Sequence, residues 1–145
     1  MHDLPHDVER ALSNVYALPC RAISISSYGA LQLGFGEATS YFLAGKYSKK
    51  RFEIELGTYT SAWDCTNSRG LSRPLDEQAI ASALLGRTVV SIHVTACCVV
   101  LATDSGQTIV IDGRETSEDI FYAHLGGDVS VVFNPESGWS VEGTC

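Results

Sequence analysis

Short runs in which apolar and polar residues alternate recur along most of this chain. The clearest run, 52–56, reads Phe-Glu-Ile-Glu-Leu and would place three apolar side chains on one face of a strand and two glutamates on the other. Runs 22–26 and 31–35 alternate in the same way around the turn-forming residues 27–29, which favours a β-hairpin. A period of two predicts antiparallel β-structure that buries one face of each sheet.

The second half of the chain continues this pattern in shorter strands separated by turns. Strands are expected at 90–94, 98–101, 108–112, 129–133 and 139–141, with short extended segments at 41–43 and 120–122. The run 98–101 is almost wholly apolar, which is typical of a central strand covered on both faces.

One helix is well specified by the sequence. Pro74 and the acidic residues after it suit a first helical turn, Ile80 and Leu84 have helical spacing, and Gly86 is a typical stop. These signals predict a helix over 74–85. Within the polar N-terminal segment, residues 7–12 are expected to form only a short helix.

The strand pattern itself is repeated. Two segments of similar pattern are each followed by two further strands: 19–25, 31–35 and 52–57 in the first copy, and 86–92, 99–103 and 108–113 in the second. Either the chain carries an internal duplication, or two unrelated meanders share the alternation that every meander has.

We therefore predict an α+β fold dominated by β-structure, in which one helix links two antiparallel meander units that pack as a sandwich or a half-barrel. A length of 145 residues fits a single domain. Its expected parts are a polar segment at 1–15, a first β unit at 18–60, the helix at 74–85 and a second β unit at 87–142.

The charge of the chain restricts its partners. The formal net charge is −7, from 17 acidic and 10 basic residues. Because lysine and arginine drive binding to phosphate, we expect no nucleic-acid partner and favour a basic protein. Lys46, Lys49, Lys50 and Arg51 form a local basic stretch that could still bind a polyanion, and we interpret it as a solvated, mobile loop.

Neither a membrane nor an export route is indicated. The longest apolar runs, such as 96–102, span about seven residues, whereas a membrane span needs about 20. The N-terminal residues lack a basic stretch followed by an apolar one, so we expect a cytoplasmic protein. Five cysteines at irregular spacing fit reduced thiols, and adjacent Cys97 and Cys98 are interpreted as small buried hydrophobes.

The sequence contains no recognisable catalytic motif. A nucleophile elbow, a P-loop, a His-Glu-x-x-His helix and a Cys-x-x-Cys pair are all missing from the 145 residues. An enzyme would depend on Cys65 as a nucleophile near Arg69, or on His124 as an acid–base group with Glu118 or Asp119. We expect no enzymatic activity, cofactor or metal.

The order of several short motifs resembles a known group of proteins. These motifs are 31–36 (LQLGFG), 52–56 (FEIEL), 61–63 (SAW), 83–89 (ALLGRTV), 106–111 (GQTIVI), Glu118, Phe121–Tyr122 and Trp139. The chain looks like small bacterial immunity proteins of polymorphic and contact-dependent growth-inhibition toxin systems over roughly residues 18–142. The motifs record strand and helix order, so no binding residue of the family is carried over.

The resemblance implies an immunity protein that binds the C-terminal domain of a cognate toxin and occludes its active site. A nuclease toxin is basic around its site, so acidic residues and exposed aromatic rings would supply the contacts. The expected partner-binding residues are Trp63, Asp64, Asp104, Asp112, Glu115, Glu118, Asp119 and Tyr122. The alternatives are a structural β-domain that forms a homodimer through exposed strand edges, and a small enzyme that uses Cys65 or His124.

Overall fold

A computed structural model describes residues 4–43, 47–66, 77–95, 97–114, 116–125 and 129–142. In chain order the elements are α1 (His6–Leu12), a 3-10 helix (Ser13–Ala17), β1 (Cys20–Ile25), β2 (Leu31–Leu43), β3 (Tyr47–Thr58), β4 (Trp63–Thr66), α2 (Glu77–Leu84), β5 (Val89–Thr95), β6 (Cys98–Thr103), β7 (Thr108–Asp112), β8 (Phe121–His124), β9 (Ser130–Asn134) and β10 (Gly138–Glu142).

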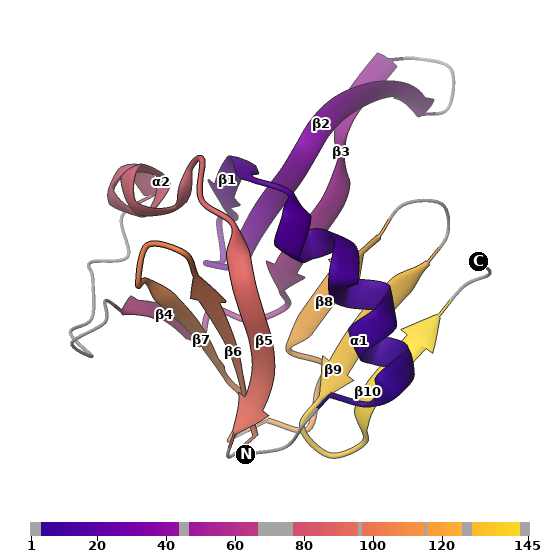
Figure 1. The fold of residues 1–145 in the computed structure, drawn as a ribbon, viewed down its shortest axis with the longest axis vertical. Helices are drawn as coiled ribbons and strands as arrows, with labels where there is room; N and C mark the ends of the chain where they lie inside the picture. Colours follow the sequence, from indigo (N-terminus) through magenta and orange to yellow (C-terminus); the bar gives the residue numbers. More distant parts are fainter. Residues whose placement is uncertain are drawn as a thin grey trace.

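The strands form two antiparallel sheets (Figure 1). One sheet has the strand order β1-β2-β3-β8-β9-β10, and the other has the order β4-β7-β6-β5. The predicted β-dominated α+β fold is therefore confirmed, and the two sheets pack as a sandwich.

The first meander, β1 to β3, follows the alternation in the sequence. Ile23 pairs with Leu33, and Leu33 pairs with Leu56, so this row of apolar side chains lies on the inner face of the sheet. The β2–β3 pairing continues past a bulge after Phe35 as far as Leu43. In Figure 1 this two-stranded extension projects from the body of the molecule.

The basic stretch was expected to be a loop, but most of it lies in a strand. Lys49, Lys50 and Arg51 lie within β3, where they pair with residues 39–41 of β2. Their interpretation as a mobile loop is wrong, because the long β2–β3 ladder extends through them. Lys46 lies outside the described residues.

The second meander, β5 to β7, forms most of the smaller sheet, and β4 adds to it beside β7. The apolar strand β6 is central, as predicted. Cys97, in the turn before β6, is exposed with a φ of 65°, so the expectation of a buried side chain is wrong there. Its neighbour Cys98 is buried as expected.

The last three strands return to the first sheet. Strand β8 pairs with β3, so that His124 faces Glu55 and Tyr122 faces Gly57. Residues 121–142, which belong to the predicted second unit, thereby extend the sheet of the first unit. This long-range pairing creates the broad outer face on which the candidate site lies.

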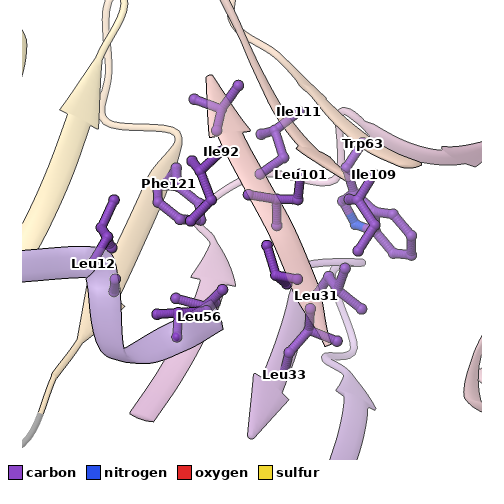
Figure 2. Close-up of a cluster of buried hydrophobic side chains, with 14 of the residues drawn as sticks. Leu12, Leu31, Leu33, Leu56, Trp63, Ile92, Leu101, Ile109, Ile111 and Phe121 are labelled. Carbon is purple, nitrogen blue, oxygen red and sulfur yellow. The ribbon is translucent and has the colours of Figure 1, made fainter. Parts of the chain in front are cut away.

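One apolar core fills the space between the sheets (Figure 2). The six-stranded sheet contributes Leu31, Leu33, Leu56 and Phe121, and the four-stranded sheet contributes Trp63, Ile92, Leu101, Ile109 and Ile111. Each of these side chains is at most 4% exposed. Full burial of an aliphatic side chain of this size contributes roughly 1.5–3 kcal/mol, so the core holds the two sheets together.

The N-terminal helix completes the core. Val8, Leu12 and Val15 are at most 1% exposed, although the surrounding residues are polar. Helix α1 contacts β10 at the edge of one sheet, and the 3-10 helix contacts β5 at the edge of the other. The N-terminal segment is therefore amphipathic and closes one side of the sandwich.

Helix α2 covers another side of the sandwich, where it contacts β1. Ile80 and Leu84 are buried there, and the Gly86 amide donates to the Cys20 carbonyl at 2.8 Å. The described part of the predicted 74–85 helix begins at Glu77. None of the helices in the described ranges combines the length and apolar character needed to cross a bilayer.

Candidate functional site

The outer face of the six-stranded sheet carries a groove of about 440 Å³, which we call the tyrosine groove. Its aromatic and polar lining consists of Tyr28, Tyr59, Tyr122, His124, Ser24, Ser26, Gln32 and Thr58. This volume lies within the range of about 300–1,000 Å³ that is typical of ligand sites.

The register of four strands builds the floor of the groove. Ser24, Gln32, Gly57 and Tyr122 form one row across β1, β2, β3 and β8. Gly57 leaves room for the Tyr122 ring, because a Cβ atom at position 57 would lie 2.3 Å from Tyr122 Oη. The ring therefore lies across β3 instead of standing away from the sheet.

Backbone anchors hold the other two tyrosines beside this floor. Thr58 Oγ1 accepts the Leu31 amide at 2.9 Å, and the Tyr59 amide donates to the Ile120 carbonyl at 3.1 Å. Tyr28 sits in the β1–β2 turn, where the next residue, Gly29, has a φ of 91°. The turn thus presents Tyr28 at the mouth of the groove.

Three rings follow one another along the groove. The centroid of Tyr122 lies 5.0 Å from that of Tyr59 and 4.9 Å from that of His124, with interplanar angles of 53° and 42°. These are ordinary distances for packed aromatic pairs. Tyr59 is 47% exposed and Tyr28 is 71% exposed, so a partner can reach much of the aromatic surface.

A second row adds polar groups to the same face. Glu55, His124 and Ser130 pair across β3, β8 and β9, and His124 Nδ1 lies 2.7 Å from Ser130 Oγ. Burial raises the pKa of Tyr122 above its ordinary value, and the negative charge of Glu55 raises it further. The groove therefore combines aromatic surface, hydroxyl groups and a nearby carboxylate.

Tyr122 is the one residue of the predicted set that lines the tyrosine groove. The sequence had also suggested His124 as a partner of Glu118 or Asp119. Those residues precede β8, whereas His124 ends it and contacts Ser130. The hydrogen-bond partner that the structure shows for His124 is thus Ser130, and the suggested acid–base pair stays a hypothesis.

Three other predicted residues gather on the four-stranded sheet. Trp63, Asp64 and Asp112 line a shallow pocket of about 270 Å³ together with Ser61, Ala62 and Val110. Trp63 is only 4% exposed, and its indole N–H donates to the Gly29 carbonyl at 2.7 Å. Trp63 is thus a core side chain that supports the β1–β2 turn, and not the exposed anchor that a binding role requires.

The remaining acidic residues do not form one patch. Asp104 follows β6, whereas Asp112 ends β7, so the two carboxylates lie at opposite ends of the small sheet. Asp119 accepts Asn134 Nδ2 at 3.0 Å, and Glu118 lies in the exposed segment before β8. Glu115 lies outside the described residues.

Asp112 also forms an ion pair with a residue close to it in the sequence. Its carboxylate binds the Arg114 guanidinium through two contacts of 3.0 and 2.8 Å. This ion pair lowers the pKa of Asp112 to about 2. Asp112 therefore presents less net charge to a partner than the sequence suggested.

Two of the described thiols, Cys65 and Cys20, are buried and therefore poorly placed for catalysis. Cys65 lies in β4 and not in a loop, is 0% exposed, and donates to Gln107 Oε1 at 3.7 Å. Burial raises the pKa of Cys20 to about 11. Within the described part of the chain, no three histidine, cysteine, aspartate or glutamate side chains lie close enough together to hold a metal ion.

Several groove residues were missed by sequence reasoning. The expected partner-binding set lacks Tyr28, Tyr59, Gln32 and Ser130, whereas the alternation over 52–56 places Glu55 on the polar face of its strand. The signal lies in the pairing of 55–58 with 121–124, which brings distant residues together. A single sequence does not reveal that pairing.

Fold and site together define a two-sheet β-sandwich with an open, tyrosine-rich face. Comparison of the chain with protein-family models, with curated proteins and with solved structures gives no match.

Proposed function

We propose that this chain is a protein-binding domain of the immunity type, which neutralises a toxin domain by covering its surface. The tyrosine groove is the observation that carries the proposal. Tyrosine and serine are the residues that protein-binding loops of antibodies use most, because tyrosine offers a large amphipathic surface with few rotatable bonds. Here both kinds of residue are held on a hydrogen-bonded sheet, which lowers the entropy lost on binding.

Charge supports a basic partner. The net charge of −7 attracts a cationic protein surface and accelerates its association. A toxin that cleaves nucleic acid needs a cationic site for phosphate, so an acidic cover is complementary to it. The acidic residues dispersed over the surface would then contribute to the association rate, and the aromatic groove to the stability of the complex.

Co-expression tests the proposal directly. The proposal predicts a toxin domain encoded beside this gene, and that domain is produced in bacteria together with this chain or with a variant of it. We expect the wild-type chain to restore growth, and the Tyr59→Ala, Tyr122→Ala double variant to lose protection. Loss of a tyrosine hot spot costs about 2 kcal/mol or more, which corresponds to about a 30-fold weaker complex.

A matched control separates the groove from a general surface effect. Val90→Ala changes an uncharged, 53% exposed side chain on the edge strand β5 of the small sheet and should leave protection intact. Equal protection by the tyrosine variant and the wild type would refute the groove as the binding face, provided that both are folded.

One observation favours a second candidate function, a hydrolase. Glu55, His124 and Ser130 bring a carboxylate, an imidazole and a hydroxyl together on neighbouring strands, the residue types of a catalytic triad. A fluorophosphonate probe tests this candidate, because it labels a serine that a histidine activates. Labelling that disappears in Ser130→Ala would favour the hydrolase, and an unlabelled wild-type chain would exclude it.

A further inference from the structure

We infer that the tyrosine groove receives an arginine side chain of its protein partner, with the guanidinium plane on the Tyr122 ring and its charge balanced by Glu55. The inference rests on the proposed function and names the chemistry that this same site recognises. It follows from the rings, the charges and the hydrogen-bonding groups of the groove.

The rings provide the surface. Cations bind over the faces of aromatic rings, and a planar guanidinium also stacks on them. Tyr122 lies across Gly57 and is half-buried, which holds the ring in place. Tyr59 packs beside it and remains 47% exposed, so a side chain that enters the groove meets two tyrosines.

The charges select a cation. Glu55 lies one row from Tyr122 on the same face, close enough for its charge to raise the pKa of the Tyr122 hydroxyl. Glu53 is exposed two residues further along β3. None of the described residues that line the groove is a lysine or an arginine. An incoming cation is thus attracted by a carboxylate and meets neither lysine nor arginine among the described lining residues.

The hydrogen-bonding groups favour arginine over lysine. A guanidinium carries five N–H donors in one plane and needs several acceptors around it. The Glu55 carboxylate, which accepts a hydrogen bond from Gln32 Nε2 at 3.5 Å, lies on the strand next to the Gln32 side-chain carbonyl, and the Ser24 hydroxyl lies one strand further. A compact ammonium group would use fewer of these acceptors and would not stack.

NMR titration of the whole chain tests the inference with two small probes. N-acetyl-arginine amide carries the cation, and N-acetyl-citrulline amide has nearly the same shape without the charge. We expect the arginine probe to shift the side-chain resonances of Tyr59, Tyr122 and His124 and to bind at least about tenfold more tightly than the citrulline probe.

Single substitutions show which groups of the site contribute to binding of the arginine probe. Glu55→Gln should weaken the arginine probe by about three- to tenfold, and the control Glu136→Gln, in the exposed β9–β10 turn, should not. Tyr122→Phe should retain binding and Tyr122→Leu should lose it. If Tyr122→Leu does not fold, Tyr59→Leu gives the same comparison on the neighbouring ring.

The outcomes separate this inference from the proposed function. Equal shifts by arginine and citrulline, or no effect of Glu55→Gln, would overturn the arginine site even where the tyrosine variants abolish protection from the toxin. Selective arginine binding by a wild-type chain that fails to protect against the toxin would instead support the cation site and contradict the proposed function.

Discussion

At the scale of single residues, Gly57 decides the shape of the groove. Alanine at position 57 would place a Cβ atom 2.3 Å from Tyr122 Oη, so the ring must move away from β3. We expect Gly57→Ala to lower stability by about 1–3 kcal/mol, the usual cost of an added methyl group in a packed site. The Tyr122 ring resonances should shift at the same time, which NMR detects.

Gly86→Ala is the control for this substitution. Gly86 has a φ of 82° and open space around it, so alanine there costs about 1 kcal/mol through backbone strain alone. Its Tyr122 resonances should match the wild type. Unchanged Tyr122 resonances in Gly57→Ala would show that the glycine does not set the ring position.

The buried Cys20 thiol should make the stability of the fold depend on pH. Burial raises the pKa of this thiol from the ordinary 9.0 to about 11. Between these two values the unfolded thiol loses its proton and the folded one keeps it, so stability falls as pH rises from 9 to 11 and is unaffected below 9. A shift of this size corresponds to at most about 3 kcal/mol.

The comparison with Cys20→Ala isolates this effect. Burial also raises the pKa values of Tyr16 and Tyr122, but both tyrosines remain in the variant. Urea unfolding under reducing conditions at pH 8, 9, 10 and 11 should show a steeper loss of stability in the wild type. Parallel curves for the two proteins would contradict the predicted role of the Cys20 thiol.

At the scale of elements, α1 closes the sandwich through very few residues. Leu12 is 0% exposed and lies in the shared core (Figure 2). We expect Leu12→Ala to lower the free energy of unfolding by about 2–5 kcal/mol, because it leaves a cavity under the helix. Glu9→Ala, on the exposed face of α1, should cost less than about 0.5 kcal/mol in the same denaturation assay. Equal losses from the two variants would mean that the helix does not pack as described.

Elements with strict alternation were predictable from the sequence, and those that depend on distant pairing were not. The 22–35 hairpin and the 52–56 strand follow from local pattern, because a period of two specifies both the strand and its buried face. The junction of β3 with β8 has no local signature, since antiparallel pairing of 55–58 with 121–124 depends on the whole fold. The short helix expected at 7–12 is present as α1, but its polar surroundings did not indicate that Val8 and Leu12 would be fully buried.

The site was harder to predict than the fold for the same reason. Acidic residues that lie close in the sequence, such as Asp104 and Asp112, are separated because β6 and β7 run in opposite directions. Tyr59 and Tyr122, which are distant in the sequence, are brought together by the β3–β8 ladder. Sequence proximity is therefore a poor guide to a site on an antiparallel sheet.

At the scale of the whole molecule, the two sheets share one core and should unfold together. Leu101 lies in β6 of the small sheet and packs in the same apolar cluster as Leu56 of β3 in the large one. We expect Leu101→Ala to cost about 2–5 kcal/mol. Because neither sheet can keep its inner face covered without the other, the slowest-exchanging amides of β3 should lose the same free energy of protection as those of β6.

Native-state hydrogen exchange measures this coupling strand by strand. Val100→Ala, on the partly buried outer face of β6, is the matched control and should lower protection in both sheets by a smaller amount. If Leu101→Ala weakens β5 to β7 while β3 and β8 keep their full protection, the small sheet opens independently and the molecule contains two folding units. Equal loss across both sheets would establish one cooperative unit, in which the tyrosine groove is as stable as the core beneath it.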